Sequence, residues 1–168
     1  MTSPTPSDPT AAPPIRILFV CLGNICRSPA AEAAFLQLVA EAGRDREFVV
    51  DSAGTGAWHV GERADARMRQ AAARRGIEIR SVARQVTRTD FEDFDWILAM
   101  DASNLEALHR MAPSARRARV RLFRDLDPDG CGRDVPDPYY GDRNGFDEVL
   151  DIVTRTARAL LAELTQSA

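Results

Sequence analysis

Apolar residues occur along the chain in two patterns, as short unbroken runs and as longer stretches with helical spacing. The short runs are rich in β-branched and aromatic residues, which is typical of strands buried on both faces of a parallel sheet. The longer stretches repeat every three or four positions, as on one side of a helix. The runs predict strands at residues 15–20, 48–50, 96–100 and 120–123. The spaced stretches predict helices at residues 28–42, 64–75, 101–111 and 146–164.

Strands and helices therefore alternate along the chain, with a loop rich in Asp, Pro and Gly at residues 125–144. This order predicts a small three-layer α/β fold, in which helices cover both faces of a four-stranded parallel sheet. The length of 168 residues fits one domain, which we place at residues 15–165. Residues 1–14 hold five of the ten prolines and predict a disordered tail.

Composition narrows the classes of function. The 22 basic residues are all arginine and face 25 acidic residues, for a net charge of −3. The absence of lysine excludes Schiff-base catalysis, and the slight acidity disfavours nucleic acid as a partner. No apolar run reaches the roughly 18 residues of a membrane span, so no membrane partner is expected. Two scattered histidines predict no metal site.

Cysteine usage and the N-terminal segment bear on location. Three cysteines, an odd number, do not form a disulfide framework, and residues 2–14 lack the basic start and apolar run of a signal peptide. We therefore expect a cytoplasmic protein, although export by a route that needs no signal peptide stays open. Neither feature fixes the oligomeric state, for which a monomer or a weak dimer is expected.

The candidate chemistry lies in the segment from Cys21 to Pro29, which joins the first strand to a helix. Ligands bind at the carboxyl ends of parallel strands, where loop N–H groups and a helix N-terminus favour a tetrahedral anion. Arg27 can fold over this loop and grip two oxygens, and the same field favours a nucleophilic thiolate at Cys21. Ser28 can donate a hydrogen bond to that sulfur. The Cys-x5-Arg spacing alone is a weak signal in a chain so rich in arginine.

Further segments make the pattern specific. The sequence Cys-Leu-Gly-Asn-Ile-Cys-Arg-Ser-Pro closely resembles the phosphate-binding loop of the low-molecular-weight protein tyrosine phosphatases. The resemblance continues in order along the chain and covers residues 15 to about 163. Its other segments are residues 51–55, 82–86, 100–105 and 137–141.

The resemblance implies hydrolysis of phosphotyrosine in proteins, without a cofactor. Cys21 would attack phosphorus to form a phosphocysteine, while Arg27 and the loop N–H groups hold the oxygens. Asp137 would protonate the leaving phenolate and then activate water. The residues alone do not choose this aspartate, because Asp127, Asp129 and Asp134 occupy the same loop. The match to Asp-Pro-Tyr-Tyr at residues 137–140 does.

The resemblance also assigns supporting roles around the phosphate. The phosphate-binding loop residues are Leu22, Gly23, Asn24, Ile25, Cys26 and Ser28. Hydrogen bonds that hold the loop would come from Asn24, Ser28 and Ser52. The rim of the pocket would be formed by Trp58, His59, Tyr139 and Tyr140. The chain departs from the family at Ser81, where a histidine is usual, so we expect the support of Asn24 to pass through water or to weaken.

The sequence makes different predictions for the two remaining cysteines. Cys26 follows Cys21 by five positions in a tight loop, so it either forms a reversible, protective disulfide with Cys21 or is a small buried side chain. Cys131, in the long loop, is expected to be incidental.

An arsenate reductase on the same fold is an alternative, but that chemistry needs further cysteines to relay a disulfide.

Two further alternatives belong to other classes of protein. A non-catalytic phosphoprotein-binding module would lack the nucleophile or the acid, and this chain has both Cys21 and Asp137. A nucleotide-binding regulator of the flavodoxin type would place hydroxyl-rich loops against the phosphate. The sequence favours the phosphatase over both.

Overall fold

The computed structural model of the protein describes residues 12–130, 133–139, 141 and 144–166. Its strands are β1 (Ile15–Cys21), β2 (Phe48–Gly54), β3 (Trp96–Ala99) and β4 (Arg119–Leu122). Its α-helices are α1 (Arg27–Glu41), α2 (Ala66–Ala73), α3 (Asp90–Asp93), α4 (Ala102–Met111) and α5 (Asn144–Gln166). Two short 3-10 helices are η1 (Asp45–Glu47) and η2 (Phe123–Leu126).

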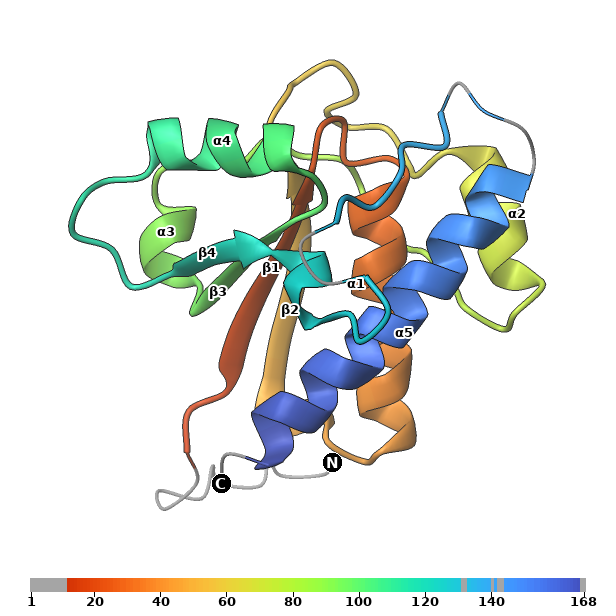
Figure 1. The fold of residues 1–168 in the computed structure, drawn as a ribbon, viewed down its shortest axis with the longest axis horizontal. Helices are drawn as coiled ribbons and strands as arrows, with labels where there is room; N and C mark the ends of the chain where they lie inside the picture. The colour runs from red at the N-terminus through yellow and green to blue at the C-terminus, as the bar shows by residue number, and fades with distance from the viewer. Residues whose placement is uncertain (1–11, 131–132, 140, 142–143, 167–168) are drawn as a thin grey trace, which may run out of the picture.

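The strands form one parallel sheet in the order β2-β1-β3-β4, so β1 is central (Figure 1). The carboxyl end of β1 lies beside the ends of both neighbours, because Val20 pairs with Ala53 of β2 and with Ala99 of β3. Cys21 pairs with Gly54 at the end of β2. The sheet confirms the predicted four parallel strands. It brings the carboxyl ends of all four strands to the same edge of the sheet.

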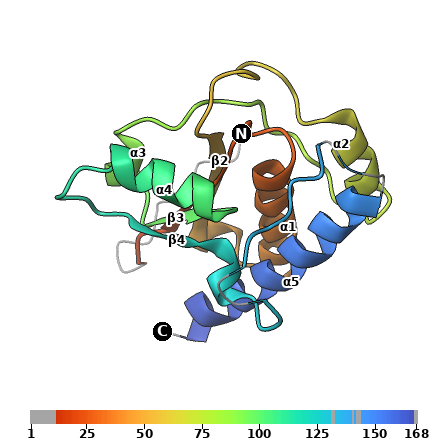
Figure 2. The same ribbon diagram turned by 45° about the horizontal axis from the view of Figure 1, so that its top comes forward.

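Helices cover both faces of this sheet (Figures 1 and 2). Helices α1, α2 and α5 lie on one face, where Ile17 and Phe19 of β1 join the larger core. Helices α3 and α4 lie on the other face, where Leu18 and Val20 join a second core. This alternation follows from the two-residue period of a strand. The predicted three-layer α/β fold is confirmed.

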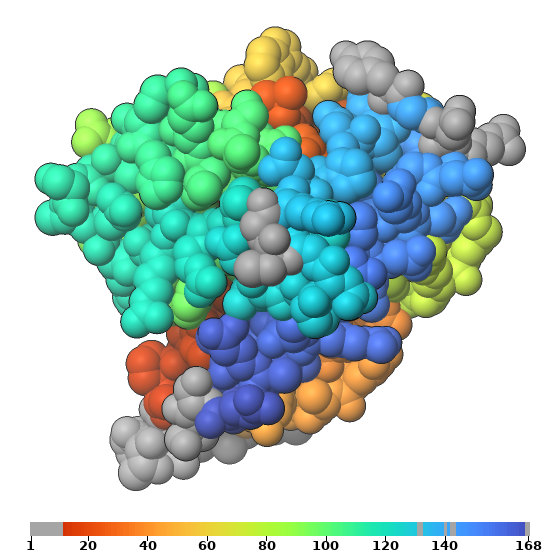
Figure 3. Space-filling model, in the orientation of Figure 1, coloured from red at the N-terminus to blue at the C-terminus, as the bar shows by residue number. Residues whose placement is uncertain are grey.

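The long loop after η2 runs across one side of the molecule. In the space-filling view, its cyan and light-blue surface fills the space between α4 in green and α5 in blue (Figure 3). The Val135 N–H donates to the Met100 carbonyl at 2.7 Å, which ties the loop to the end of β3. The loop therefore returns residue 137 to the same edge of the sheet as residue 21.

Two local features differ from the prediction. The predicted strand ends at residue 50, because Asp, Ser and Gly disfavour strands, but residues 51–54 continue β2 and pair with residues 18–21 of β1. Pairing along a central strand satisfies their backbone groups and outweighs the local preference. Helix α3 was not predicted, because its four residues are too few to display a helical period.

The predicted disordered tail falls on residues 1–11, which lie outside the described part of the chain, and on residues 12–14 next to β1. Among the helices of the described residues, none combines the length and apolar character needed to cross a membrane.

Candidate active site

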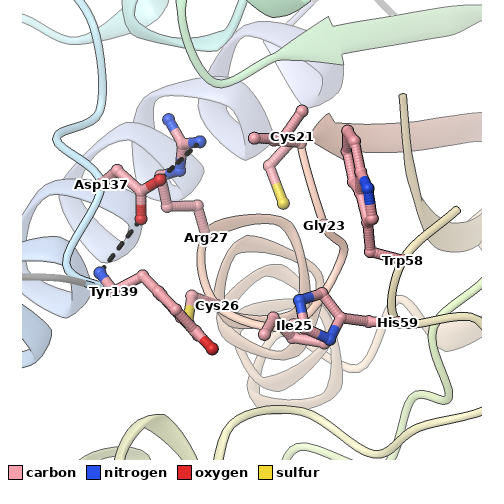
Figure 4. Close-up of a pocket in the computed structure, with 10 residues that line it drawn as sticks. Cys21, Gly23, Ile25, Cys26, Arg27, Trp58, His59, Asp137 and Tyr139 are labelled. Atoms are coloured by element: carbon pink, nitrogen blue, oxygen red, sulfur yellow. Dashed lines mark hydrogen bonds and ion pairs between the residues drawn. The ribbon is translucent and has the colours of Figure 1, made fainter. Parts of the chain in front are cut away.

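A pocket of about 410 Å³ opens at the carboxyl edge of the sheet, beside the end of β1 (Figure 4). Three segments line it: the loop between β1 and α1, the loop after β2, and the long loop before α5. The lining residues are Cys21, Leu22, Gly23, Ile25, Cys26, Arg27, Trp58, His59, Asp137 and Tyr139. The structure therefore brings together residues that the sequence predicted from three distant segments.

Cys21 is the last residue of β1, and its sulfur points into the pocket (Figure 4). The Asn24 N–H donates to Cys21 Sγ at 3.3 Å, so the loop curls around the sulfur. The Ser28 hydroxyl lies 3.0 Å from the same sulfur. Helix α1 begins at Arg27, and its N-terminus adds partial positive charge beside the loop. This partial positive charge would stabilise an anion next to Cys21 Sγ.

Asn24 holds the loop in shape. Its φ of +56° lies in the left-handed region, which is uncommon for a residue other than glycine. Its Nδ2 donates to Ser28 Oγ at 2.8 Å and to Ser52 Oγ at 3.0 Å, while its Oδ1 accepts from the Arg84 N–H at 3.0 Å. These three bonds offset the backbone strain. The carboxamide oxygen is thus satisfied by the backbone of Arg84, so its support does not depend on the side chain of Ser81.

Gly54 lets the end of β2 approach the loop closely. A Cβ at this position would lie 2.7 Å from the Leu22 carbonyl oxygen and 3.2 Å from the Asn24 nitrogen. The next two N–H groups along the chain donate to the loop, from Thr55 to the Cys21 carbonyl and from Gly56 to the Leu22 carbonyl, each at 2.9 Å. The loop is therefore held by backbone contacts on the side facing β2.

Arg27 is nearly buried, with its side chain 4% exposed. Its Nη1 donates to Asp101 Oδ2 at 2.6 Å and to the Val135 carbonyl at 3.1 Å, and its Nη2 lies 3.6 Å from Asp137 Oδ2. Burial opposes the charge, but Cys21 and Asp101 together raise the pKa of Arg27, so the guanidinium stays charged. Sequence reasoning gave Asp101 no role. Its position directly after a strand end could have revealed it.

The structure distinguishes the four aspartates of the long loop. Asp127 is buried, and Arg155 at 2.8 Å with Arg124 at 3.0 Å holds its pKa well below the usual range. Asp134 accepts from the N–H of Ala102 at the start of α4, and the side chain of Asp129 is exposed. Of the four, Asp137 alone lines the pocket, with its side chain 43% exposed.

Aromatic side chains form the walls of the pocket. Trp58 is 73% exposed, and a Cβ at Gly56 would overlap its ring, so the indole rests on that glycine. The His59 ring lies against Gly23 and binds Glu62 through Nδ1 at 2.7 Å. Tyr139 faces His59 across the pocket, with ring centroids 6.2 Å apart (Figure 4). The fourth predicted rim residue, Tyr140, lies outside the described residues.

Cys26 lines the pocket beside Cys21, and both are free thiols. Burial, with a further contribution from the nearby Asp65 carboxylate, raises the pKa of the Cys26 thiol. Cys131 lies outside the described residues. Within the described chain, no group of three or more His, Cys, Asp or Glu side chains is arranged to hold a metal ion.

Glu32 is a further residue that sequence reasoning missed. Its Oε1 accepts a hydrogen bond from Ser52 Oγ at 2.6 Å, and burial raises its pKa to about 7. The signal was available, because Glu32 is the only charged residue between Ser28 and Glu41 on a largely apolar helix.

Comparisons with known proteins agree on one family. The profile described as "Low molecular weight phosphotyrosine protein phosphatase" matches residues 16–168. A low molecular weight protein-tyrosine-phosphatase of Streptomyces coelicolor is 47% identical over 154 residues, which cover 90% of this chain and 94% of that protein.

Solved structures support the same grouping. The fold is similar to a protein tyrosine phosphatase of Entamoeba histolytica with Hepes in its active site, at a TM-score of 0.87 and 38% identity over 91% of this chain and 98% of that one. It is also similar to an arginine phosphatase of Drosophila, at a TM-score of 0.83 and 32% identity over 89% of this chain and 98% of that one.

Proposed function

Because the chain belongs to the low molecular weight phosphotyrosine protein phosphatases, and is therefore a phosphatase, we propose that it hydrolyses phosphotyrosine in proteins through a phosphocysteine on Cys21. One observation carries this proposal. The Cys21 sulfur, the Arg27 guanidinium and the Asp137 carboxyl converge on one pocket from three separate segments. This set supplies a nucleophile, a phosphate-binding cation and a proton donor.

The first step is transfer of the phosphoryl group to sulfur. The Cys21 thiolate attacks phosphorus, so that an S–P bond forms while the bond from phosphorus to the phenolic oxygen breaks. Asp137 in its acid form gives its proton to that oxygen. Arg27 and the N–H groups at the start of α1 hold the other phosphate oxygens, whose charge they stabilise. The Ser28 hydroxyl, 3.0 Å from the sulfur, stabilises the thiolate.

The second step releases phosphate. Asp137, now a carboxylate, takes a proton from a water molecule that attacks phosphorus, and the S–P bond breaks. Inorganic phosphate forms, and the Cys21 thiolate and the Asp137 acid are regenerated. The proximity of Asp137 to Arg27, at 3.6 Å, supports both steps because it places the carboxyl beside the bound phosphate.

The pocket walls suit an aromatic substrate. The rings of Trp58 and Tyr139 and the apolar side chain of Ile25 would contact the phenyl ring of phosphotyrosine. The exposed indole would also meet residues next to the phosphotyrosine in the chain of the target. Tyrosine-phosphorylated proteins are therefore the proposed partners.

The proposed reaction needs a reducing setting. Cys21 must be unoxidised to attack phosphorus, and Cys26 beside it is also a thiol. We therefore place the working enzyme in the cytoplasm. If a peroxide oxidised the Cys21 thiolate to a sulfenic acid, Cys26 would attack that sulfur, release water and form a disulfide that protects the nucleophile, although the raised pKa of Cys26 would slow its attack.

Phosphoarginine is a second candidate substrate, because a Drosophila arginine phosphatase shares the fold at 32% identity. Its planar guanidinium could stack on the same aromatic walls. Phosphoarginine would also bring several N–H donors into a pocket whose lining at Ile25 and Leu22 is apolar. This lining favours phosphotyrosine.

The experiment is hydrolysis of an aryl phosphate by the wild type and by Cys21→Ser, with Cys131→Ser as the control for the same change at the cysteine expected to be incidental. We expect Cys21→Ser to lose turnover and Cys131→Ser to keep it. Turnover by Cys21→Ser would overturn the mechanism. Matched peptides with phosphotyrosine, phosphoserine or phosphoarginine decide the substrate, and a higher kcat/KM for phosphoarginine would replace the proposal with that alternative.

A further inference from the structure

A chain of hydrogen bonds leads from the Cys21 sulfur to a carboxyl group outside the pocket. Ser28 Oγ lies 3.0 Å from the sulfur and accepts from Asn24 Nδ2 at 2.8 Å. The same Nδ2 donates to Ser52 Oγ at 3.0 Å, and Ser52 Oγ donates to Glu32 Oε1 at 2.6 Å. Glu32 lies on α1, one turn after Ser28. The proposed mechanism uses the sulfur end of this chain and leaves the carboxyl end unexplained.

When Glu32 is a carboxylate, the hydrogen bonds of this chain leave Asn24 Nδ2 in two directions, toward Glu32 and toward Cys21. The Asn24 amide has two protons, one for Ser52 and one for Ser28. Ser52 has a single hydroxyl proton, and Glu32 accepts it. Ser28 keeps its own proton, for which the Cys21 sulfur at 3.0 Å is a nearer acceptor than the Ala53 carbonyl at 3.5 Å. A charged acceptor polarises the Ser52 hydroxyl, so the bond from Asn24 to Ser52 becomes stronger and fixes the orientation of the Asn24 carboxamide.

The charges around Glu32 leave its carboxyl without a cationic partner. In the described part of the chain, Glu32 forms no ion pair within 4 Å. Arg84 is the cation that acts on it, but Arg84 already binds Asp51 at 3.0 Å and Asp90 at 3.0 and 3.1 Å. Asp51 adds negative charge nearby. Burial and Asp51 together outweigh Ser52 and Arg84, and the pKa of Glu32 rises to about 7.

We propose that Glu32 is a positioning residue, whose carboxylate form holds Asn24 in its left-handed conformation and directs the Ser28 hydroxyl to Cys21. A proton on Glu32 replaces a charged acceptor with a neutral one, which weakens the bond from Ser52. Asn24 then loses part of its support and the loop loosens around the sulfur. This role rests on the proposed function, because it concerns the nucleophile of that reaction.

The test compares kcat/KM for an aryl phosphate between the wild type and Glu32→Gln across pH. The titration of the substrate is the same with both proteins and cancels in the ratio. We expect the wild type to be about fivefold faster at about pH 8 and equal to the variant at about pH 5.5. Glu41→Gln, the same change at an exposed site on the same helix, should give a ratio of one throughout. A Glu32→Gln ratio that does not vary with pH overturns the proposal.

A second measurement separates this proposal from the proposed function. Inorganic phosphate binding is followed by calorimetry at the same two pH values, and its wild-type advantage over Glu32→Gln should also appear only at the higher pH. This holds even if the protein hydrolyses no phosphate monoester, a result that would end the proposed function alone. If Glu32→Gln does not fold, the Asn24 side-chain amide resonance of the wild type is followed by NMR. A shift of this resonance with a midpoint near the Glu32 pKa of about 7 supports the proposal. A resonance that does not move with pH overturns it.

Discussion

The Arg27 guanidinium and the Asp101 carboxylate are joined by a bond of 2.6 Å, which links the start of α1 to the start of α4. Asp101 uses its other oxygen, Oδ1, to accept from the Asn104 N–H and cap α4. One carboxylate thus fixes both the orientation of the proposed phosphate-binding arginine and the first turn of a helix. Arg27 also binds the Val135 carbonyl, so the loop that carries Asp137 is fastened to the same guanidinium.

Asp101→Asn should weaken phosphate binding without unfolding the protein. Asparagine is as good an N-cap as aspartate, so α4 is preserved, while the charge that orients Arg27 is lost. We expect KM for an aryl phosphate to rise about tenfold, with a smaller change in kcat. Steady-state kinetics measures both. Asp93→Asn, at an exposed site on α3, is the control, and an unchanged KM for Asp101→Asn would contradict the orienting role.

Asp137→Asn should slow the reaction in a way that depends on the leaving group. An amide has no acid proton, so a poor leaving group such as phenolate loses general-acid assistance, and we expect kcat to fall about 100-fold. A nitrophenolate needs no proton, so its release should be affected far less. A pre-steady-state burst separates this step from hydrolysis of the phosphocysteine. The mechanism fails if phenolate and nitrophenolate are released with equal losses, or if Asp129→Asn has the same effect.

Gly54→Ala should disturb the phosphate-binding loop from outside the pocket. The new methyl group would meet the Leu22 carbonyl at 2.7 Å, and this neighbour is backbone that cannot swing away. We expect kcat/KM to fall about 100-fold, since a displacement of 1 Å in an active site has an effect of this order. The matched control is Gly141→Ala, whose nearest contact would be an ordinary 3.7 Å. Normal kinetics for Gly54→Ala would show that the loop tolerates displacement.

Asp127→Asn should destabilise the fold at neutral pH. Because the folded pKa of Asp127 lies below its unfolded value, its charge contributes stability above about pH 4, and this contribution is lost as pH falls through the folded pKa. Leaving Arg124 and Arg155 without their buried partner should cost about 3 kcal/mol of unfolding free energy at pH 7. Urea denaturation at pH 7 and at about pH 3 measures the difference, which should shrink in acid.

Asp129, an exposed aspartate in the same loop, provides the control for Asp127→Asn. Asp129→Asn should change the unfolding free energy by no more than about 0.5 kcal/mol, because its side chain is 71% exposed. An equal loss for Asp127→Asn and Asp129→Asn would mean that the buried cluster does not stabilise the long loop.

Much of the site could be predicted because its centre is local in sequence. Cys21 and Arg27 lie in one short loop, and a strand before it with a helix after it already fixes their relative placement. The partners of that loop are not local. Arg84 contributes its backbone N–H to Asn24, and a backbone group leaves no mark in a sequence. The sequence could place Asp101 at the end of a strand, but it could not predict the hydrogen bond that Asp101 accepts from the guanidinium of Arg27.

The long loop shows the same limit. Its aspartates are equivalent in composition, and the family resemblance alone selected Asp137. The structure gives a physical reason for this choice, since Asp127 is paired with arginines from η2 and α5 and Asp134 bonds to the start of α4. Arg155 lies 28 positions from Asp127 and Ala102 lies 32 positions from Asp134, so only the tertiary fold could reveal these two partners.

The contacts of the loop with the end of β2 have a consequence for kinetics. The N–H groups of Thr55 and Gly56 bind the Cys21 and Leu22 carbonyls, so contacts within the protein set the shape of this loop. The conformational entropy of this loop is therefore lost once, during folding, and not again at each encounter with substrate. The association rate for a phosphate ester should accordingly follow solvent viscosity, with no slower phase for rearrangement of the loop.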